Sequence, residues 1–197
     1  MANLVTRRLL IGALAAMAGA RRAAASPLKT RGTGMSAYDF SFTSIDGAPL
    51  PLAQFRGHPL LVTNTASFCG FTPQYTDLEA VWRRYRERGL VVIGVPSNDF
   101  GQQEPGSSGE IKKFCEANYA VDFPLTEKVE VVGRHPHPFF AWIAAELGDA
   151  GAPRWNFHKY LVGPDGALEG AWPSAVRPTD RDVTAEIERL LPAKPAS

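Results

Sequence analysis

The stretch LLVTNTASFCGFTPQY, residues Leu60–Tyr75, contains one of the two cysteines of the chain. It opens with an apolar run, and this run predicts a buried strand over residues 59–66. Pro73 suits the first turn of a helix, and Thr72 just before it suits the N-cap. Cys69 is therefore expected on the turn between a strand and a helix.

The helix after Cys69 and the strand behind it complete a strand, helix, strand unit. Apolar residues recur at helical spacing up to Gly89, a residue type that commonly ends helices. Residues 90–96, LVVIGVP, form a second continuous apolar run, as expected for a parallel strand covered on both faces. The apolar positions of the helix are Tyr75, Leu78, Val81, Trp82 and Tyr85.

Shorter signals on either side of this unit predict an α/β domain of three layers, with helices flanking a mixed central sheet. Asp46-Gly47 and Asp165-Gly166 are turn signals of β-hairpins. The further predicted elements are an N-terminal β-hairpin of residues 38–42 and 49–52, helices capped by Ser107 with Glu110 and by Thr179 with Asp182, a helix over Pro138–Glu146, and a closing hairpin within residues 156–172.

Composition and charge favour one globular domain. The chain has 197 residues, of which 45% are hydrophobic, and this is enough for one core of ordinary size. Its 21 Lys and Arg residues balance 20 Asp and Glu residues, so no basic excess indicates a nucleic-acid partner. Beyond the first residues, no apolar run reaches the roughly 18 residues that indicate a transmembrane helix.

The first 25 residues resemble a removable export signal. Arg7 and Arg8 precede the weakly hydrophobic run Leu9–Ala20, and Ala23–Ala25 suits signal cleavage. The paired arginines resemble a twin-arginine signal, although a general secretory signal and an amphipathic tail without function remain open. We therefore expect an export signal over residues 1–25, a linker over 26–36, the folded domain over 37–192 and a tail over 193–197, with a periplasmic mature protein that is not inserted in the membrane.

Cys69 has a chemical and a structural interpretation. A thiol reacts as its thiolate, and the N–H groups and dipole at a helix N-terminus lower a cysteine pKa from about 8.5 to roughly 3.5–7.5. Active sites of α/β sheets also gather beyond the carboxyl ends of the strands. The alternative is a small buried cysteine without chemical function.

The neighbours of Cys69 exclude other classes of thiol site. Thr72 stands three residues later, so no Cys-x-x-Cys dithiol motif is present. Pro73 stands four residues later, so a copper-carrying site lacks its second sulfur. The histidines are scattered, with His135 and His137 as the only close pair, and no metal site is expected.

Four stretches of sequence occur together in a characteristic order within residues 38–191. They are NTASFCGFTPQY, VPSNDFGQQEPGSSGEI, FCEANYAVDFPLTEKVEV and WNFHKYLVGPDG. This set resembles the glutathione peroxidase family. The resemblance implies a thioredoxin-like fold, no cofactor, and thiol-dependent reduction of hydrogen peroxide and organic hydroperoxides in response to oxidative stress. It also implies that Cys69 is the peroxidatic residue and that Gln103, Trp155 and Asn156 complete the site.

The residue types of this implied site suit peroxide chemistry. A thiolate that attacks an O–O bond becomes a sulfenic acid and expels an oxyanion, which needs hydrogen bonds where its charge develops. The amides of Gln103 and Asn156 and the indole of Trp155 supply N–H donors without adding a competing base. Taken singly, these residues also suit a solvated loop, a turn and the core.

Cys115 is a candidate resolving cysteine. Thioredoxin-dependent members of the family carry their resolving cysteine in the same segment, but one residue later, at the position of Glu116. The helical period set by Ile111 and Phe114 turns Cys115 inward. Many bacterial relatives have a cysteine where this chain has Ser97. The reductant is therefore expected to be a thioredoxin-like protein if Cys115 reacts with Cys69, and glutathione or another external thiol if it does not.

Other functions remain as alternatives to an exported thiol peroxidase. A peroxiredoxin-like peroxidase needs a threonine and an arginine around its nucleophile that SFCGF does not provide. A redox sensor would use oxidation of Cys69 as a signal and turn over slowly, and a metallochaperone would bind copper. The short connection between Ala145 and Arg154 lacks the insertion of tetrameric family members, which favours a monomer.

Overall fold

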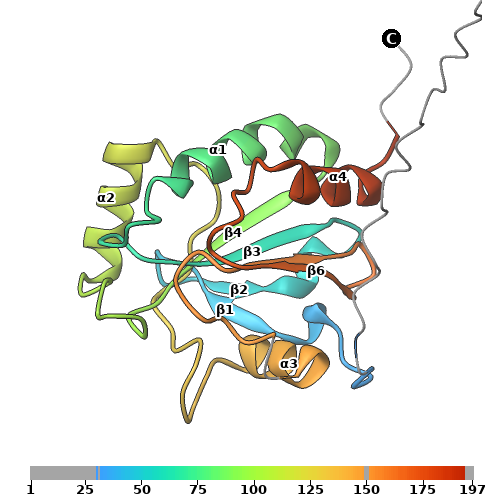
Figure 1. The fold of residues 1–197 in the computed structure, drawn as a ribbon, viewed down its shortest axis with the longest axis horizontal. Coiled ribbons are helices and arrows are strands. Elements are labelled where there is room, and N and C mark those ends of the chain that lie inside the picture. The colour runs from blue at the N-terminus through green and yellow to red at the C-terminus, as the bar shows by residue number, and fades with distance from the viewer. Residues whose placement is uncertain (1–29, 31, 149–150, 194–197) are drawn as a thin grey trace, which may run out of the picture.

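A mixed four-stranded sheet forms the centre of the computed structural model, which describes residues 30, 32–148 and 151–193 (Figure 1). The strand order is β4-β3-β5-β6. β3 (Leu60–Thr65) and β4 (Val91–Pro96) are parallel, whereas β5 (Lys159–Val162) is antiparallel to β3 and to β6 (Leu168–Trp172). The predicted mixed sheet is confirmed, and the predicted export signal lies outside the described residues.

Helices cover both faces of the sheet. α1 (Gln74–Tyr85) and α4 (Arg181–Leu190) lie on one face, and α3 (Pro138–Leu147) lies on the other with the hairpin of β1 (Ser41–Thr43) and β2 (Pro49–Pro51) (Figure 1). α2 (Ser108–Tyr119) packs beside α1. No helix in the described part of the chain is long and apolar enough to cross a membrane.

The alternation of side chains along β3 divides the apolar core in two. Leu61 packs in the core that includes α1, α2 and α4, while Leu60 and Val62 pack in the core that includes α3 and the hairpin. All six residues of β3 are buried, as expected for a central strand covered on both faces. The predicted layers are therefore present, with β3 at the middle of the molecule.

The start of the N-terminal hairpin differs from the sequence prediction. Residues 38–39 belong to a 3₁₀ turn, Ala37–Asp39, and β1 begins at Ser41. The Asp39 carboxylate accepts a hydrogen bond from the Ser36 N–H at 2.8 Å, and the Ser36 hydroxyl accepts one from Tyr38 N–H. This capping box stabilises a helical turn at residues whose alternation alone favours a strand.

The helix starts are confirmed for α2 and shifted for two other helices. Ser107 and Glu110 form the predicted capping box of α2. α4 begins after Asp180 rather than Thr179, and the Thr179 hydroxyl is directed to the Asp77 carboxylate at 3.4 Å instead. In α1 the N-cap position is occupied by Pro73, so the prediction of Thr72 at that position is wrong.

The described chain enters the domain far from Cys69. The N–H groups of Gly32 and Thr33 donate to the Glu146 carboxylate of α3 at 2.9 and 2.8 Å. The Ala37 N–H then donates to the Gly166 carbonyl, on the turn between β5 and β6, at 2.9 Å. Part of the predicted linker is thus bound to the domain, at the end of the sheet where that turn lies.

Candidate active site

Three loops that carry the candidate residues meet at one edge of the sheet. β3 and β4 are parallel, so the loops that follow them leave from the same edge. β5 runs antiparallel to β3, with Thr63 opposite Lys159, and the segment before β5 therefore arrives at that edge too. Cys69, Gln103 and the Trp155-Asn156 pair lie on these loops, where binding sites of α/β sheets gather.

The Cys69 loop is closed by Thr72. The Thr72 hydroxyl accepts a hydrogen bond from the Cys69 N–H at 2.9 Å and lies within donating distance of the Ala66 and Cys69 carbonyls, at 2.9 and 2.7 Å. The Phe71 N–H points to the Cys69 sulfur at 3.4 Å. Thr72 therefore fixes the loop instead of capping α1, and the loop directs a backbone donor at the sulfur. Cys69 is 7% exposed.

The Gln103 loop is joined to the Cys69 loop through the backbone. The Phe68 N–H donates to the Gln103 carbonyl at 3.0 Å, and the Glu104 N–H donates to the Asn98 side chain at 2.8 Å. Gly101 and Gln102 just before it both have positive φ, 67° and 52°, which gives the loop a tight turn. Gln103 is consequently held beside the peptide that precedes Cys69.

Trp155 and Asn156 complete the arrangement from the segment before β5. The Asn156 side-chain amide donates to Gln103 Oε1 at 3.1 Å. The Trp155 ring lies 5.8 Å from that of Phe100 and is 40% exposed. The structure thus brings Gln103 and Asn156 into direct contact and links both to the Cys69 loop. Among the described residues, the sulfur itself has its hydrogen bond only with the Phe71 N–H.

Asn64 is a site residue that the sequence reasoning missed. It is fully buried in β3, and its side chain donates to the Trp155 carbonyl at 3.1 Å and accepts the His158 N–H at 3.0 Å. These bonds fix the segment that carries Trp155 and Asn156. The available signal was an asparagine inside a buried apolar strand, because a buried amide there needs specific partners.

Lys159 is a second such residue, fully buried below the same segment. Its ammonium donates to Gln74 Oε1 at 3.0 Å and to the Phe157 carbonyl at 2.6 Å. Phe157 has a positive φ of 63°, an uncommon conformation for an aromatic residue. Burial lowers the pKa of Lys159 to about 7, and burial lowers the pKa of the neighbouring His158 to about 4. The segment before β5 therefore rests on a buried polar network.

Cys115 lies on α2 and is fully buried, as its helical position predicts. Burial raises the pKa of its thiol to about 11. Both cysteines are free thiols. Cys115 is thus protected from solvent and protonated in this conformation.

His137 and His158 have structural partners of their own. His137 caps α3 by accepting the Phe139 N–H, and the His158 ring stacks on Tyr160 at 4.8 Å. Within residues 30, 32–148 and 151–193, no group of three His, Cys, Asp or Glu side chains could hold a metal ion.

Comparison with known proteins identifies the family. The model of the glutathione peroxidase family matches residues 37–144. The chain belongs to the glutathione peroxidase family. It is 48% identical over 162 residues to the hydroperoxy fatty acid reductase gpx1 of Synechocystis sp., covering 78% of this chain and 95% of that protein. It is 42% identical over 149 residues to the glutathione peroxidase-like peroxiredoxin HYR1 of Saccharomyces cerevisiae, covering 74% and 90%.

Solved structures of related glutathione peroxidases confirm the predicted thioredoxin-like fold. The crystal structure of T. cruzi GPX1 superposes with a TM-score of 0.64 at 28% identity, and the match covers 79% of this chain and 96% of that one. Family and fold agree with the sequence prediction, and the chain is a thiol-dependent peroxidase.

Proposed function

We propose that this peroxidase reduces hydrogen peroxide and organic hydroperoxides through a sulfenic acid at Cys69. The observation that carries the proposal is the convergence of Cys69, Gln103 and Asn156 on one edge of the sheet, with the two amides hydrogen-bonded to each other. The names of the relatives support both parts of the substrate range, since they include a hydroperoxy fatty acid reductase and peroxiredoxins.

The reaction begins with attack of the Cys69 thiolate on the terminal oxygen of the hydroperoxide. An S–O bond forms while the O–O bond breaks, so that sulfur is oxidised to a sulfenic acid and the peroxide is reduced. The leaving alkoxide or hydroxide takes up a proton and departs as an alcohol or water. One external thiol then condenses with the sulfenic acid, which gives a mixed disulfide and water. A second external thiol attacks this mixed disulfide, so that the two external thiols leave as a disulfide and the Cys69 thiol is restored.

The N–H groups of the site face the reacting atoms. The Phe71 N–H points to the Cys69 sulfur at 3.4 Å. Gln103 and Asn156 are held beside the loop, where their amides stabilise the developing oxyanion. Trp155 stands directly before Asn156 and is 40% exposed, and its indole is a further N–H donor on the same segment.

We propose further that Cys115 resolves the sulfenic acid after α2 opens. Only Ile111 and Cys115 of the twelve residues of α2 are fully packed in the core, while Phe114 and Tyr119 pack partly against it, and an element with few buried residues opens more easily than the central strands. The resulting disulfide would be reduced by a thioredoxin-like dithiol protein rather than by glutathione. The name of the yeast relative, a peroxiredoxin, supports such a partner.

The test begins with the reduced protein, one equivalent of hydroperoxide and a sulfenic-acid trap, followed by mass spectrometry and a thiol count. Loss of both thiols without an adduct supports resolution by Cys115. A single trapped adduct on Cys69 contradicts it and indicates direct reduction by glutathione or another small thiol. Peroxide consumption by Cys69→Ser at the wild-type rate would contradict the proposed function itself, and rapid oxidation without turnover would indicate a redox sensor.

We also propose that the protein is exported to the periplasm and is a monomer. The paired arginines and the alanine-rich run of residues 1–25 support export by a twin-arginine-type route. Fractionation of a bacterial host with N-terminal sequencing of the product tests this, and an intact N-terminus in the cytoplasm contradicts it. Light scattering of the purified protein tests the monomer.

A further inference from the structure

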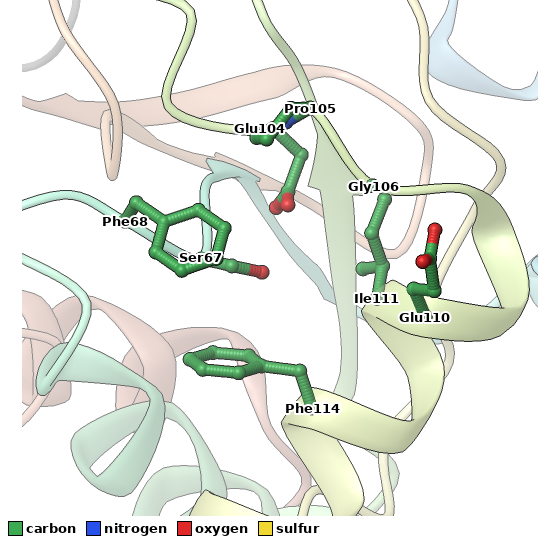
Figure 2. Close-up of a pocket in the computed structure, with 8 residues that line it drawn as sticks. All are labelled: Ser67, Phe68, Glu104, Pro105, Gly106, Glu110, Ile111 and Phe114. Atoms are coloured by element: carbon green, nitrogen blue, oxygen red, sulfur yellow. The ribbon is translucent and has the colours of Figure 1, made fainter.

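The Cys69 loop faces a pocket on one side and a buried polar chain on the other. On the side of α2, a pocket with a volume of about 320 Å³ lies next to the loop (Figure 2). The residues that line it are Ser67, Phe68, Glu104, Pro105, Gly106, Glu110, Ile111 and Phe114. The pocket leaves this side of the loop without close packing, so the contacts on the side toward β5 gain importance.

A continuous chain of hydrogen bonds leads from the Cys69 sulfur through the start of α1 to β5. The Phe71 N–H points to the sulfur at 3.4 Å, and the Phe71 carbonyl accepts the Gln74 N–H at 2.9 Å. Gln74 is the first residue of α1 and is buried. Its side chain donates to the Ser174 carbonyl at 2.6 Å and accepts the Lys159 ammonium at 3.0 Å. Both ends of the Gln74 amide are thus in use.

The same ammonium holds the segment that carries Trp155 and Asn156. Lys159 Nζ donates to the Phe157 carbonyl at 2.6 Å, and the Phe157 N–H donates to the Asn64 carbonyl at 2.6 Å. These bonds hold Phe157 at its positive φ of 63°, a conformation that costs free energy in an aromatic residue. We call the two bonds of the ammonium, to the Gln74 side chain and to the Phe157 carbonyl, the Lys159 bridge.

A lysine is a costly residue at this buried position. Lys159 is fully buried, and among the described residues its ammonium bonds two uncharged oxygens, those of Gln74 and Phe157. Asp77 of α1 directs both carboxylate oxygens to Arg177, at 2.8 and 2.7 Å. An apolar side chain of similar length would avoid the cost of burying a charge. Natural proteins keep such costly residues chiefly at functional sites.

The charged groups around Lys159 come from three elements. Burial lowers the pKa of Lys159 to about 7, although Asp180 at the N-cap of α4 and Asp77 of α1 act in the opposite direction. Burial also lowers the pKa of His158, directly before Lys159, to about 4, so that this ring is uncharged at neutral pH. Lys159 is therefore the group of this network that changes charge near neutral pH. An uncharged amine keeps two N–H groups for the two oxygens, but its bonds are weaker.

We propose that Lys159 is a positioning residue for the attack of the Cys69 thiolate on the peroxide. Through the Lys159 bridge, it sets the reactive loop against the segment that carries Trp155 and Asn156. The inference rests on the proposed function and adds to it a residue that never touches the peroxide. A displacement of about 1 Å between reacting groups slows a reaction strongly. Loss of the bridge therefore slows oxidation of Cys69 while the fold persists.

Stopped-flow measurement of the rate constant for oxidation of the reduced enzyme by hydrogen peroxide tests the inference. Lys159→Met should lower this constant about 10-fold in folded protein at neutral pH. Gln74→Met breaks the bridge at its other end and should lower the constant by a similar factor. The matched control is Tyr160→Phe, which removes another buried hydrogen bond of β5, from the Tyr160 hydroxyl to the Gly151 carbonyl at 2.6 Å, and should leave the constant unchanged.

The double variant Lys159→Met/Gln74→Met separates positioning from general loosening of the core. Both residues act through one bridge, so the double variant should be no slower than the slower single variant. Multiplication of the two effects, or an equal loss in Tyr160→Phe, would overturn the inference. A wild-type rate constant in folded Lys159→Met would overturn it as well. If Lys159→Met does not fold, the rate constant of Gln74→Met decides alone.

An NMR titration reads the bridge directly in the Cys69→Ser protein, which has no reactive thiol. The indole N–H signal of Trp155 and the amide signal of Asn156 should shift with a midpoint at about pH 7, as Lys159 releases its proton. Lys159→Met in the same background should abolish this shift, and an unchanged shift contradicts the positioning role. Wild-type enzyme that hydrogen peroxide does not oxidise would refute the proposed function itself, whereas equal oxidation of wild type and Lys159→Met refutes only the bridge.

Discussion

Gln103 is fixed to both neighbouring loops, by its carbonyl to Phe68 and by its side chain to Asn156. Gln103→Ala should slow oxidation of the reduced enzyme by hydrogen peroxide about 10- to 100-fold, because an N–H donor to the leaving oxygen is lost. Stopped-flow measurement of the second-order rate constant tests this. Gln54→Ala, at an exposed position far along the chain, is the control, and an equal rate in Gln103→Ala would contradict the role.

Thr72 supports the reactive loop through its hydroxyl, which is buried and bonded to the Cys69 N–H. Thr72→Val keeps the shape but leaves that N–H without a partner, and it should lower the free energy of unfolding by about 1–3 kcal/mol. Thr72→Ser should retain most of the stability. Denaturant unfolding measures the effect, with the exposed Thr76→Val as control. Equal losses at the two positions would contradict a specific role for Thr72.

At the scale of elements, α2 controls access to Cys115. Its capping box joins Ser107 and Glu110, so Ser107→Ala should weaken the helix by about 1 kcal/mol and raise the open population about fivefold. Alkylation of Cys115 in a Cys69→Ser background should accelerate by the same factor. Ser108→Ala, inside the first turn, is the control. Equal alkylation rates in the two serine variants would show that Cys115 is reached without opening of α2.

At the scale of the whole molecule, buried Lys159 makes stability depend on pH. Its pKa is lowered from 10.5 to about 7 in the folded protein. Between these values the unfolded chain keeps a proton that the folded chain has released, so the free energy of unfolding rises with pH in this window. Below about pH 7 both states hold the proton, and the cost of burying the charge is fully present.

Lys159→Met should therefore flatten the rise in stability between pH 7 and pH 10. Urea unfolding at several pH values measures the difference between wild type and variant. Tyrosines and Cys115 titrate in both proteins and cancel in this comparison. Lys113→Met, at an exposed lysine of α2, should keep the wild-type slope. Parallel profiles for wild type and Lys159→Met would show that the lysine is charged throughout.

The sequence predicted the parts of the fold that depend on local pattern. Apolar runs located β3 and β4, and turn signals located both hairpins, because burial on both faces and positive φ select few residue types. The predicted start of β1 was wrong because the Ser36 capping box favours a helical turn at residues whose alternation of polar and apolar side chains favours a strand. The predicted N-cap of α1 was wrong because the Thr72 hydroxyl bonds to the Cys69 loop instead. Sequence spacing cannot decide which of two possible partners such a hydroxyl binds.

The sequence predicted only those residues of the candidate site that lie in recognisable motifs. The family resemblance indicated Gln103 and Asn156, but their mutual hydrogen bond depends on the tertiary structure. Asn64 and Lys159 were missed because the role of a polar residue inside an apolar strand depends on hydrogen-bond partners that are distant in sequence. The pocket lined by Phe68, Pro105 and Phe114 could not be predicted from the sequence either. The segments that form its walls are about forty residues apart in the sequence and are brought together by the pairing of β3 with β4.

Residues 32–37 are hydrogen-bonded to Glu146 and Gly166, and these contacts determine how the enzyme is oriented when it is attached to a surface through its N-terminal segment. Both contacts lie away from the sheet edge that carries Cys69. A protein immobilised through a tag ahead of residue 30 would therefore turn its catalytic edge toward the bulk solution. Peroxide and reductant would approach it freely, and a surface or sensor coating built in this orientation would retain the turnover of the enzyme in solution.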